Sequence, residues 1–182
     1  MNTLVLGIGN LLLQDEGAGV RAVEEFGKKY RVPAEVELLD GGTSGMDLLQ
    51  YIQGRDNLII VDVVKSGNPS GTIIRLEGEE VPALLQKKIS PHQLGLSDLL
   101  AVAQLTGLMP SRVVLLGIEP EATETGLDLS EEVGRNIGKL ADMVALELVA
   151  LGLVVPTQIA LPIEDQNACR YFCSQGMGSV IT

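Results

Sequence analysis

The chain has 182 residues, a formal net charge of −11, 46% hydrophobic residues, two Phe, three Tyr and no Trp. This length suits one domain with an ordinary core, which must here be built from aliphatic side chains. The acidic balance excludes nucleic acid as a partner, because such binding relies on Lys and Arg, and the longest apolar stretch, residues 143–155, is too short to span a bilayer.

Apolar runs and helical periodicities alternate along the chain. Buried strands are predicted at residues 3–8, 35–39, 58–64 and 112–118, with a short edge strand at residues 72–76. Helices are predicted at residues 17–30, at 46–52, from a Ser97 cap to about Thr106, and from a capping box of Asp128 and Glu131 to Leu148. This alternation predicts a three-layer α/β/α sandwich around a mostly parallel, twisted sheet of about five strands.

The pattern decays after the last predicted helix, where Pro156 and Pro162 precede a Gly-rich end. We therefore expect a single α/β catalytic domain at residues 1–152 and a C-terminal extension or mobile tail at residues 153–182. The two cysteines, both in this extension, form no disulfide framework and fit a reducing compartment. No basic segment precedes the first apolar run, so we expect no secretory signal and a cytoplasmic protein.

Acidic side chains and the only histidine follow the predicted strands. Asp15 and Glu16 lie in the loop after the first strand, and Asp40 follows the second. Asp62 lies in the last part of the third strand, and His92 is predicted to lie in a loop. Since ligands of parallel sheets bind beyond the carboxyl ends of the strands, these groups are expected to face one rim.

Clustered carboxylates repel one another unless a positive group joins them. Glu16, Asp62 and a neutral His92 offer oxygen and imidazole ligands, which suit nickel, zinc, iron or manganese, whereas the absence of thiolate argues against copper(I). Three protein ligands leave a coordination position open for water or substrate, as catalytic sites require.

Simpler interpretations of the same residues remain open. A lone histidine such as His92 is more often an ordinary surface or loop residue. Glu16 is also suited to begin a helix, where an acid favours the helix dipole, and Asp40 before two glycines suits a turn. Asp62 is the hardest to explain in this way, because a buried carboxylate without a partner is costly.

Two other functional classes are weaker. Gly7 and Gly9 suggest a dinucleotide-binding fingerprint with Asp40 as the ribose ligand, but Leu12 occupies the position of its third glycine. A single histidine excludes the H-E-x-x-H signature, and the sequence GTSG at residues 42–45 is one residue short of a G-x-S-x-G elbow.

Four motifs in this order and spacing resemble the hydrogenase maturation endopeptidases. They are GIGN with QDEG at residues 7–10 and 14–17, DGGTSG at residues 40–45, Asp62, and SPHQLGL at residues 90–96. The resemblance covers about residues 1–152, whereas the extension with Cys169 and Cys173 departs from the family.

The resemblance implies an enzyme that removes the C-terminal extension of the nickel-loaded large-subunit precursor of a nickel-iron hydrogenase. Glu16, Asp62 and His92 would then contact nickel as catalytic residues, with the metal carried by the precursor and other divalent metals able to occupy the site in vitro. The turn that recognises the scissile region would be formed by Asp40, Gly41, Gly42 and Thr43.

The mechanism and the function each leave an alternative open. Nickel would either activate a water molecule, with a carboxylate as base, or serve chiefly to dock the precursor. A non-enzymatic nickel-binding or delivery protein is the alternative function. The protein is expected to act as a monomer, without nucleic acid or membrane.

Overall fold

The computed structural model describes the backbone of residues 1–85 and 91–157 and the side chains of these residues, except residues 85 and 91–94. The elements follow in the order β1 (Thr3–Ile8), η1 (Gln14–Gly17), α1 (Ala18–Lys29), β2 (Val36–Gly42), η2 (Gly45–Leu48), α2 (Leu49–Ile52), β3 (Asn57–Val63), β4 (Ile73–Glu77), α3 (Glu80–Leu85), α4 (Pro91–Leu105), β5 (Arg112–Ile118) and α5 (Glu131–Ala150).

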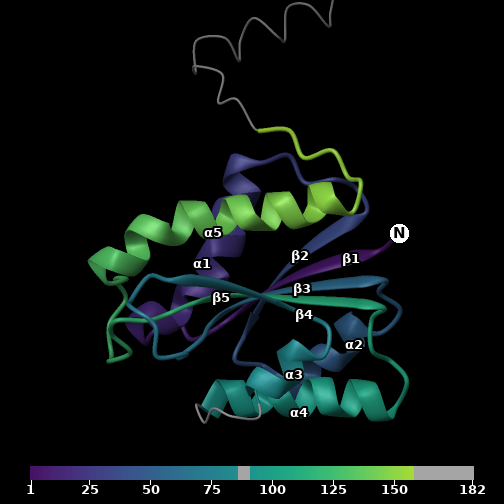
Figure 1. Cartoon of the computed structure of the whole chain (residues 1–182), viewed down its shortest axis with the longest axis horizontal. Coiled ribbons are helices and arrows are strands. Elements are labelled where there is room, and N and C mark those ends of the chain that lie inside the picture. Colours follow the sequence, from purple (N-terminus) through teal and green to yellow (C-terminus); the bar gives the residue numbers. More distant parts are fainter. Residues whose placement is uncertain (86–90, 158–182) are drawn as a thin grey trace, which may run out of the picture.

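Five strands form one sheet in the order β2-β1-β3-β5-β4 (Figure 1). All neighbouring strands are parallel except β4, which runs antiparallel to β5 at the edge. The predicted mostly parallel sheet and its edge strand at residues 72–76 are therefore confirmed. The central strands are apolar on both faces because helices cover both faces.

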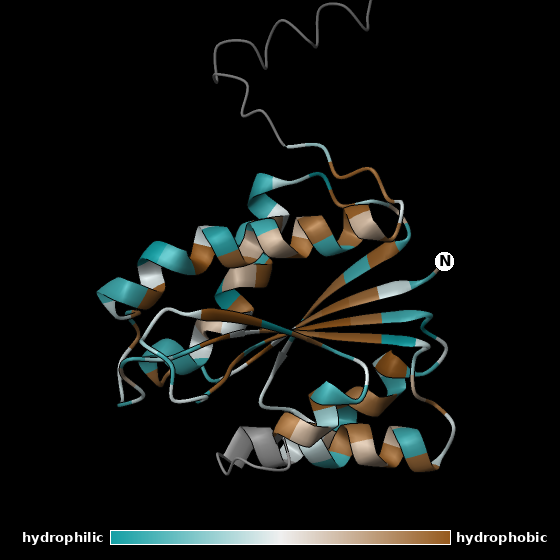
Figure 2. Cartoon of the chain, in the orientation of Figure 1, coloured by the Kyte–Doolittle hydropathy of each residue, from teal (hydrophilic) through white to brown (hydrophobic). Residues whose placement is uncertain are grey.

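Two hydrophobic clusters separate the three layers. Val5, Ile59 and Val114 point to one face of the sheet, where they pack with side chains of α1 and α5. Leu4 and Ile60 point to the other face, where η2, α2, α3 and α4 complete the second cluster. Figure 2 shows strands that are hydrophobic along much of their length between helices of mixed polarity. The predicted α/β/α sandwich is confirmed.

The structure corrects the starts of two helices. Helix α4 begins at Pro91, so the predictions of a loop at His92 and of a cap at Ser97 were wrong. Proline suits the first helical position because its ring presets φ and it lacks an N–H group there. Helix α5 is capped by Ser130, whose hydroxyl oxygen accepts a hydrogen bond from the Val133 N–H, and not by the predicted Asp128.

The last described residues lie against α1. Leu153 and Val155 pack on the cluster of α1 and α5, and the Arg31 N–H donates to the Pro156 carbonyl at 2.8 Å. The division after residue 152 stays a prediction, and Cys169 and Cys173 lie outside the described residues. Among the described helices, none has the length and apolar character needed to cross a membrane.

Candidate active site

The carboxyl ends of β1 and β3 frame a switch in the chain's direction. From β1 the chain passes through α1 to β2 on one side, whereas from β3 it continues to β4 and β5 on the other side. Open α/β sheets bind ligands at such switch points, where the loops after neighbouring strands diverge. The loops after β1 and β3 are therefore where a site is expected.

Asp62 is the second-last residue of β3 and is fully buried. Its neighbours Val61 and Val63 belong to the cluster under α1 and α5, whereas Ile60 and Val64 belong to the opposite cluster. Because side chains alternate along a strand, Asp62 points to the face covered by α4. One of its oxygens, Oδ1, accepts a hydrogen bond from the Val63 N–H at 2.7 Å.

Glu16 lies in η1, which rests directly on the carboxyl ends of β1 and β3. A Cβ atom at Gly9, where φ is +138°, would lie 1.8 Å from the Glu16 carbonyl oxygen. The same holds for the start of α1, which directly follows η1. A Cβ atom at Gly19 would lie 2.2 Å from the Val61 carbonyl oxygen and 2.4 Å from that of Ile8. Only glycine permits this approach, so the structure brings the buried Glu16 to the same rim as β3 and its Asp62.

His92 lies in the first turn of α4, and its side chain is outside the described residues. Three residues later, a Cβ atom at Gly95 would lie 3.2 Å from the Cα atom of Gly45. The start of α4 therefore packs against the segment that follows β2. The meeting of the imidazole with Glu16 and Asp62 stays a prediction.

Asp40 lies in β2, which continues to Gly42 and so is longer than predicted. Its Oδ1 atom accepts a hydrogen bond from the Gly42 N–H at 2.9 Å, and the side chain is exposed. The Gly9 N–H donates to the Gly42 carbonyl at 3.0 Å, which joins this turn to the loop after β1. Asp40 thus has the turn-forming role that its sequence context allowed, and its exposed carboxylate borders the candidate site.

Asp15 has a different role from the one its position in the sequence suggested. It is fully buried, and its carboxylate accepts hydrogen bonds from the N–H groups of Glu121 at 2.9 Å, Ala122 at 2.9 Å and Ser130 at 2.7 Å. All three donors lie in the loop between β5 and α5. Asp15 therefore holds this loop against the turn that carries Glu16, and its carboxylate is engaged by the N–H groups of that loop.

Glu119, just after β5, is another buried carboxylate that holds a loop, and it was not singled out from the sequence. Burial by itself would raise the pKa of Glu119, but hydrogen bonds from the Ser66 hydroxyl and from the N–H groups of Ser66, Gly67 and Asn68 lower this pKa below its usual range. Glu119 thereby fixes the loop after β3. No local pattern marks this role, because the donors lie more than 50 residues away.

Among the residues that the structure describes, no group of three or more His, Cys, Asp and Glu side chains is arranged to hold a metal ion. That finding does not extend to His92, whose side chain lies outside the described part of the chain.

Comparison with known proteins identifies the family. A family model described as hydrogenase maturation protease matches residues 20–147. The hydrogenase 2 maturation protease of Escherichia coli K12 is 46% identical over 154 residues, which are 84% of this chain and 94% of that protein. The chain belongs to the hydrogenase maturation protease family. A second relative, the hydrogenase expression/formation protein HupD of Rhodobacter capsulatus, is 43% identical over 84% of this chain and 73% of its own length.

Solved structures of this family share the fold. The hydrogenase maturating endopeptidase HybD of E. coli matches with a TM-score of 0.84 and 45% identity, over 87% of this chain and 98% of HybD. The [NiFe] hydrogenase maturation protease HybD of Thermococcus kodakarensis matches with a TM-score of 0.68 and 26% identity, over 81% of this chain and 99% of that protein.

Membership in this protease family confirms the predicted resemblance and endopeptidase function. It does not favour the non-enzymatic alternative, since the E. coli relatives that match most of this chain are named as a maturation protease and a maturating endopeptidase.

Proposed function

We propose that this endopeptidase removes the C-terminal extension from the nickel-loaded large-subunit precursor of a nickel-iron hydrogenase. One observation carries the proposal: in a chain of this family, Glu16 and Asp62 are both buried at the joined ends of β1 and β3. Burying carboxylates is costly, so two of them at a switch point favour a functional role. The first turn of α4, with His92, lies on the face toward which Asp62 points.

Nickel is part of the substrate in this proposal. Two carboxylates and one imidazole are suitable donors for a divalent transition ion, and three protein ligands leave positions for groups that the precursor supplies. Because the three residues of this chain provide only part of the coordination sphere, binding would be tight only when nickel is already in the precursor. Cleavage would then follow metal insertion.

The turn at Asp40, Gly41, Gly42 and Thr43 would orient the scissile region. It borders the loop after β1 through the hydrogen bond between Gly9 and Gly42, and the next residues touch the start of α4. A peptide placed between these segments would lie beside Glu16. The exposed Asp40 carboxylate would then accept hydrogen bonds from its backbone N–H groups.

Two mechanisms agree with this arrangement. In one, a carboxylate of Glu16 or Asp62 accepts a proton from the water that attacks the scissile carbonyl. In the other, the ligands chiefly hold the precursor by its nickel, so that the peptide bond lies close to a reactive group. In both, removal of one ligand abolishes cleavage. We further propose that the enzyme acts as a monomer in the cytoplasm, which size-exclusion chromatography and cell fractionation would test.

The test is to incubate the protein with a nickel-loaded precursor and to weigh the products by mass spectrometry. Release of the C-terminal peptide from the nickel-loaded precursor, and not from the nickel-free one, is the expected result. His92→Ala and Asp62→Asn should remain folded and release no peptide, whereas Glu124→Gln, which changes an exposed acid, should cleave normally.

The contrary outcomes are distinct. Normal cleavage by His92→Ala would show that the imidazole of His92 is not part of the site. Tight nickel binding by the isolated chain without peptide release would favour the nickel-delivery alternative.

A further inference from the structure

Two exposed leucines lie in neighbouring loops at the edge of the candidate site. Leu12, in the loop between β1 and η1, and Leu127, in the loop between β5 and α5, are each 62% exposed. Their loops are joined by backbone hydrogen bonds, from the Gly126 N–H to the Leu12 carbonyl at 2.9 Å and from the Gln14 N–H to the Gly126 carbonyl at 2.8 Å. We call this pair of side chains the leucine lip.

The lip is held in place by other parts of the structure and not by packing of the leucines themselves. Asp15 binds three N–H groups of the β5–α5 loop, and Arg21 donates a hydrogen bond to the Leu127 carbonyl. Gln14 has a φ of +47°, which is unfavourable for a residue with a side chain and persists only where its surroundings fix it. An apolar surface that is fixed in advance loses little conformational entropy when a partner binds.

We propose that the leucine lip binds an apolar side chain in the C-terminal segment of the hydrogenase precursor, close to the scissile bond. This inference rests on the proposed function. Leu12 precedes Glu16 in the same short loop, so a peptide that reaches Glu16 passes beside the lip. Leucine side chains at the rim of a site gain from burial against an apolar side chain of a bound peptide, and they offer no charge or hydrogen bond to a polar one.

Leu105 provides a matched control. It is 87% exposed, more than either lip residue, and it is the last residue of α4. Since the start of α4 packs against the segment that follows β2, Leu105 lies at the end of the helix far from that contact. Replacing Leu105 removes the same apolar side chain from the surface without changing the site.

The experiment measures steady-state cleavage of the nickel-loaded precursor by Leu12→Ser, Leu127→Ser and Leu105→Ser. Each serine variant of the lip should raise KM about tenfold, because the precursor no longer gains from burying one leucine side chain. The value of kcat should stay within about twofold, because the contact is equally strong in the ground state and the transition state. Leu105→Ser should match the wild type. Leu12→Met, which keeps an apolar side chain, should restore a KM near that of the wild type.

The outcomes separate this inference from the proposed function. Wild-type KM values in both serine variants, with normal cleavage, would overturn the lip and leave the protease function intact. If the wild type released no peptide, the proposed function would fail, and titration of precursor binding would still decide about the lip, because unchanged affinity in the serine variants would overturn it. A wild-type dimer that both lip variants convert to a monomer would also overturn it, since the occupant would be a second copy.

Discussion

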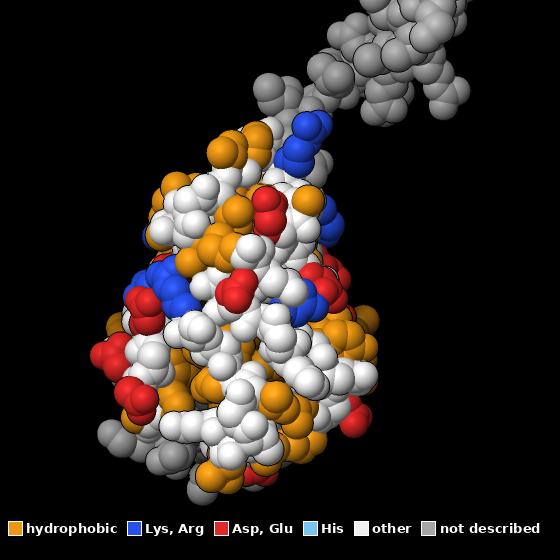
Figure 3. Space-filling model, turned by 90° about the vertical axis from the view of Figure 1, so that its right-hand side faces the viewer, with side chains coloured by type: hydrophobic (Ala, Val, Ile, Leu, Met, Phe, Trp, Pro, Cys, Tyr) orange, Lys and Arg blue, Asp and Glu red, His pale blue; other side chains and the backbone are white. Residues whose placement is uncertain are grey.

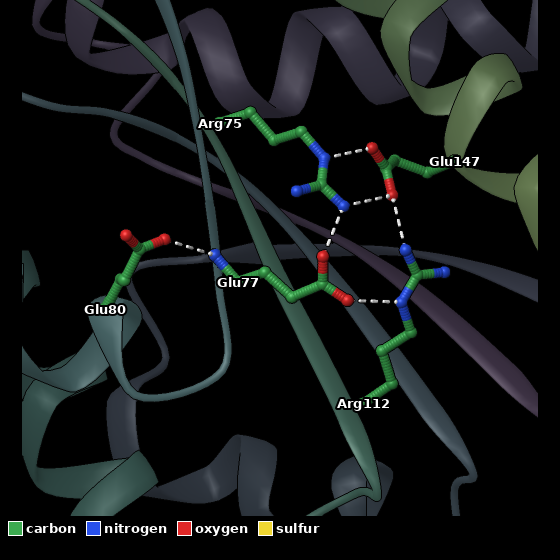
Figure 4. A network of polar contacts seen from close by, with 5 residues as sticks. All are labelled: Arg75, Glu77, Glu80, Arg112 and Glu147. Carbon is green, nitrogen blue, oxygen red and sulfur yellow. Dashed lines mark hydrogen bonds and ion pairs between the residues drawn. The ribbon is translucent and has the colours of Figure 1, made fainter.

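The two ends of the sheet compensate buried carboxylates in different ways. At the carboxyl ends of the parallel strands, Asp15 and Glu119 accept hydrogen bonds mainly from backbone N–H groups of neighbouring loops. At the opposite end, Glu147 of α5 is held by the guanidinium groups of Arg75 and Arg112 (Figure 4). Figure 3 shows that end from outside, with acidic and basic side chains lying next to one another.

The difference shows how buried carboxylates that hold the loops of a site can be compensated without an ion pair. Backbone N–H groups hold Asp15 and Glu119 and at the same time fix the loops that carry or border the candidate residues. Arginine at these positions would bring a full positive charge close to any metal ion, whereas backbone dipoles bring only partial charges. The arginine network instead fastens α5 to β5 and to the edge strand β4, at the end of the sheet opposite the candidate site.

The largest effect is expected for Asp15→Asn. The amide keeps the size of the side chain but loses the charge that binds three N–H groups and turns an NH2 group toward them. We expect a loss of about 3 kcal/mol in the free energy of unfolding, measured by urea titration, together with loss of peptide release at temperatures where the variant is folded. Full activity in folded Asp15→Asn would show that the loop it holds does not support the site.

A smaller effect is expected for Glu147→Gln, the corresponding change at the opposite end. Its carboxylate is nearly buried, but Arg75 and Arg112 are about a third and a quarter exposed, so water compensates part of the loss. We expect the free energy of unfolding to fall by about 2 kcal/mol. Peptide release by the folded variant should equal that of the wild type, and a loss of activity would contradict the separation of the two ends.

The pH dependence of stability should reveal Glu119. Its pKa is lower in the folded state than in the unfolded chain, so its contribution is fully present above the unfolded value of about 4.3 and is lost as the pH falls through the folded value. Glu119→Gln should therefore lower the melting temperature at pH 7 and make it less dependent on pH below about 4.3. If the melting temperature of Glu119→Gln depended on pH below about 4.3 as steeply as that of the wild type, the assigned role would be contradicted.

The smallest effect is expected for Arg135→Ala on the surface of α5. Arg135 forms ion pairs with Glu131 and Glu132, but its side chain is 60% exposed. Such pairs are largely compensated by water, so the free energy of unfolding should change by less than about 0.5 kcal/mol. A larger loss of stability would mean that the exposure of an ion pair is a poor guide to its contribution to the free energy of unfolding in this fold.

Much of the fold could be predicted because its signals are local. Continuous apolar runs identified the buried strands, and the helical spacing of Val20, Val23 and Phe26 identified α1, whose buried face contains these residues. The start of α4 was missed although Pro91 is a usual first residue of a helix. Helix α3 was missed because its six residues are too few for a periodic pattern.

By itself, the sequence determined the layers of this protein, its family and which acidic residues follow the strands, because each depends on residue types at short or fixed spacing. Only the tertiary structure decided that Asp15 is buried as a loop anchor while Asp40 remains exposed in its own turn. The reason is physical: the N–H groups that bind Asp15 come from residues 106 to 115 positions away, and no local pattern specifies which donors the folded chain brings to a carboxylate.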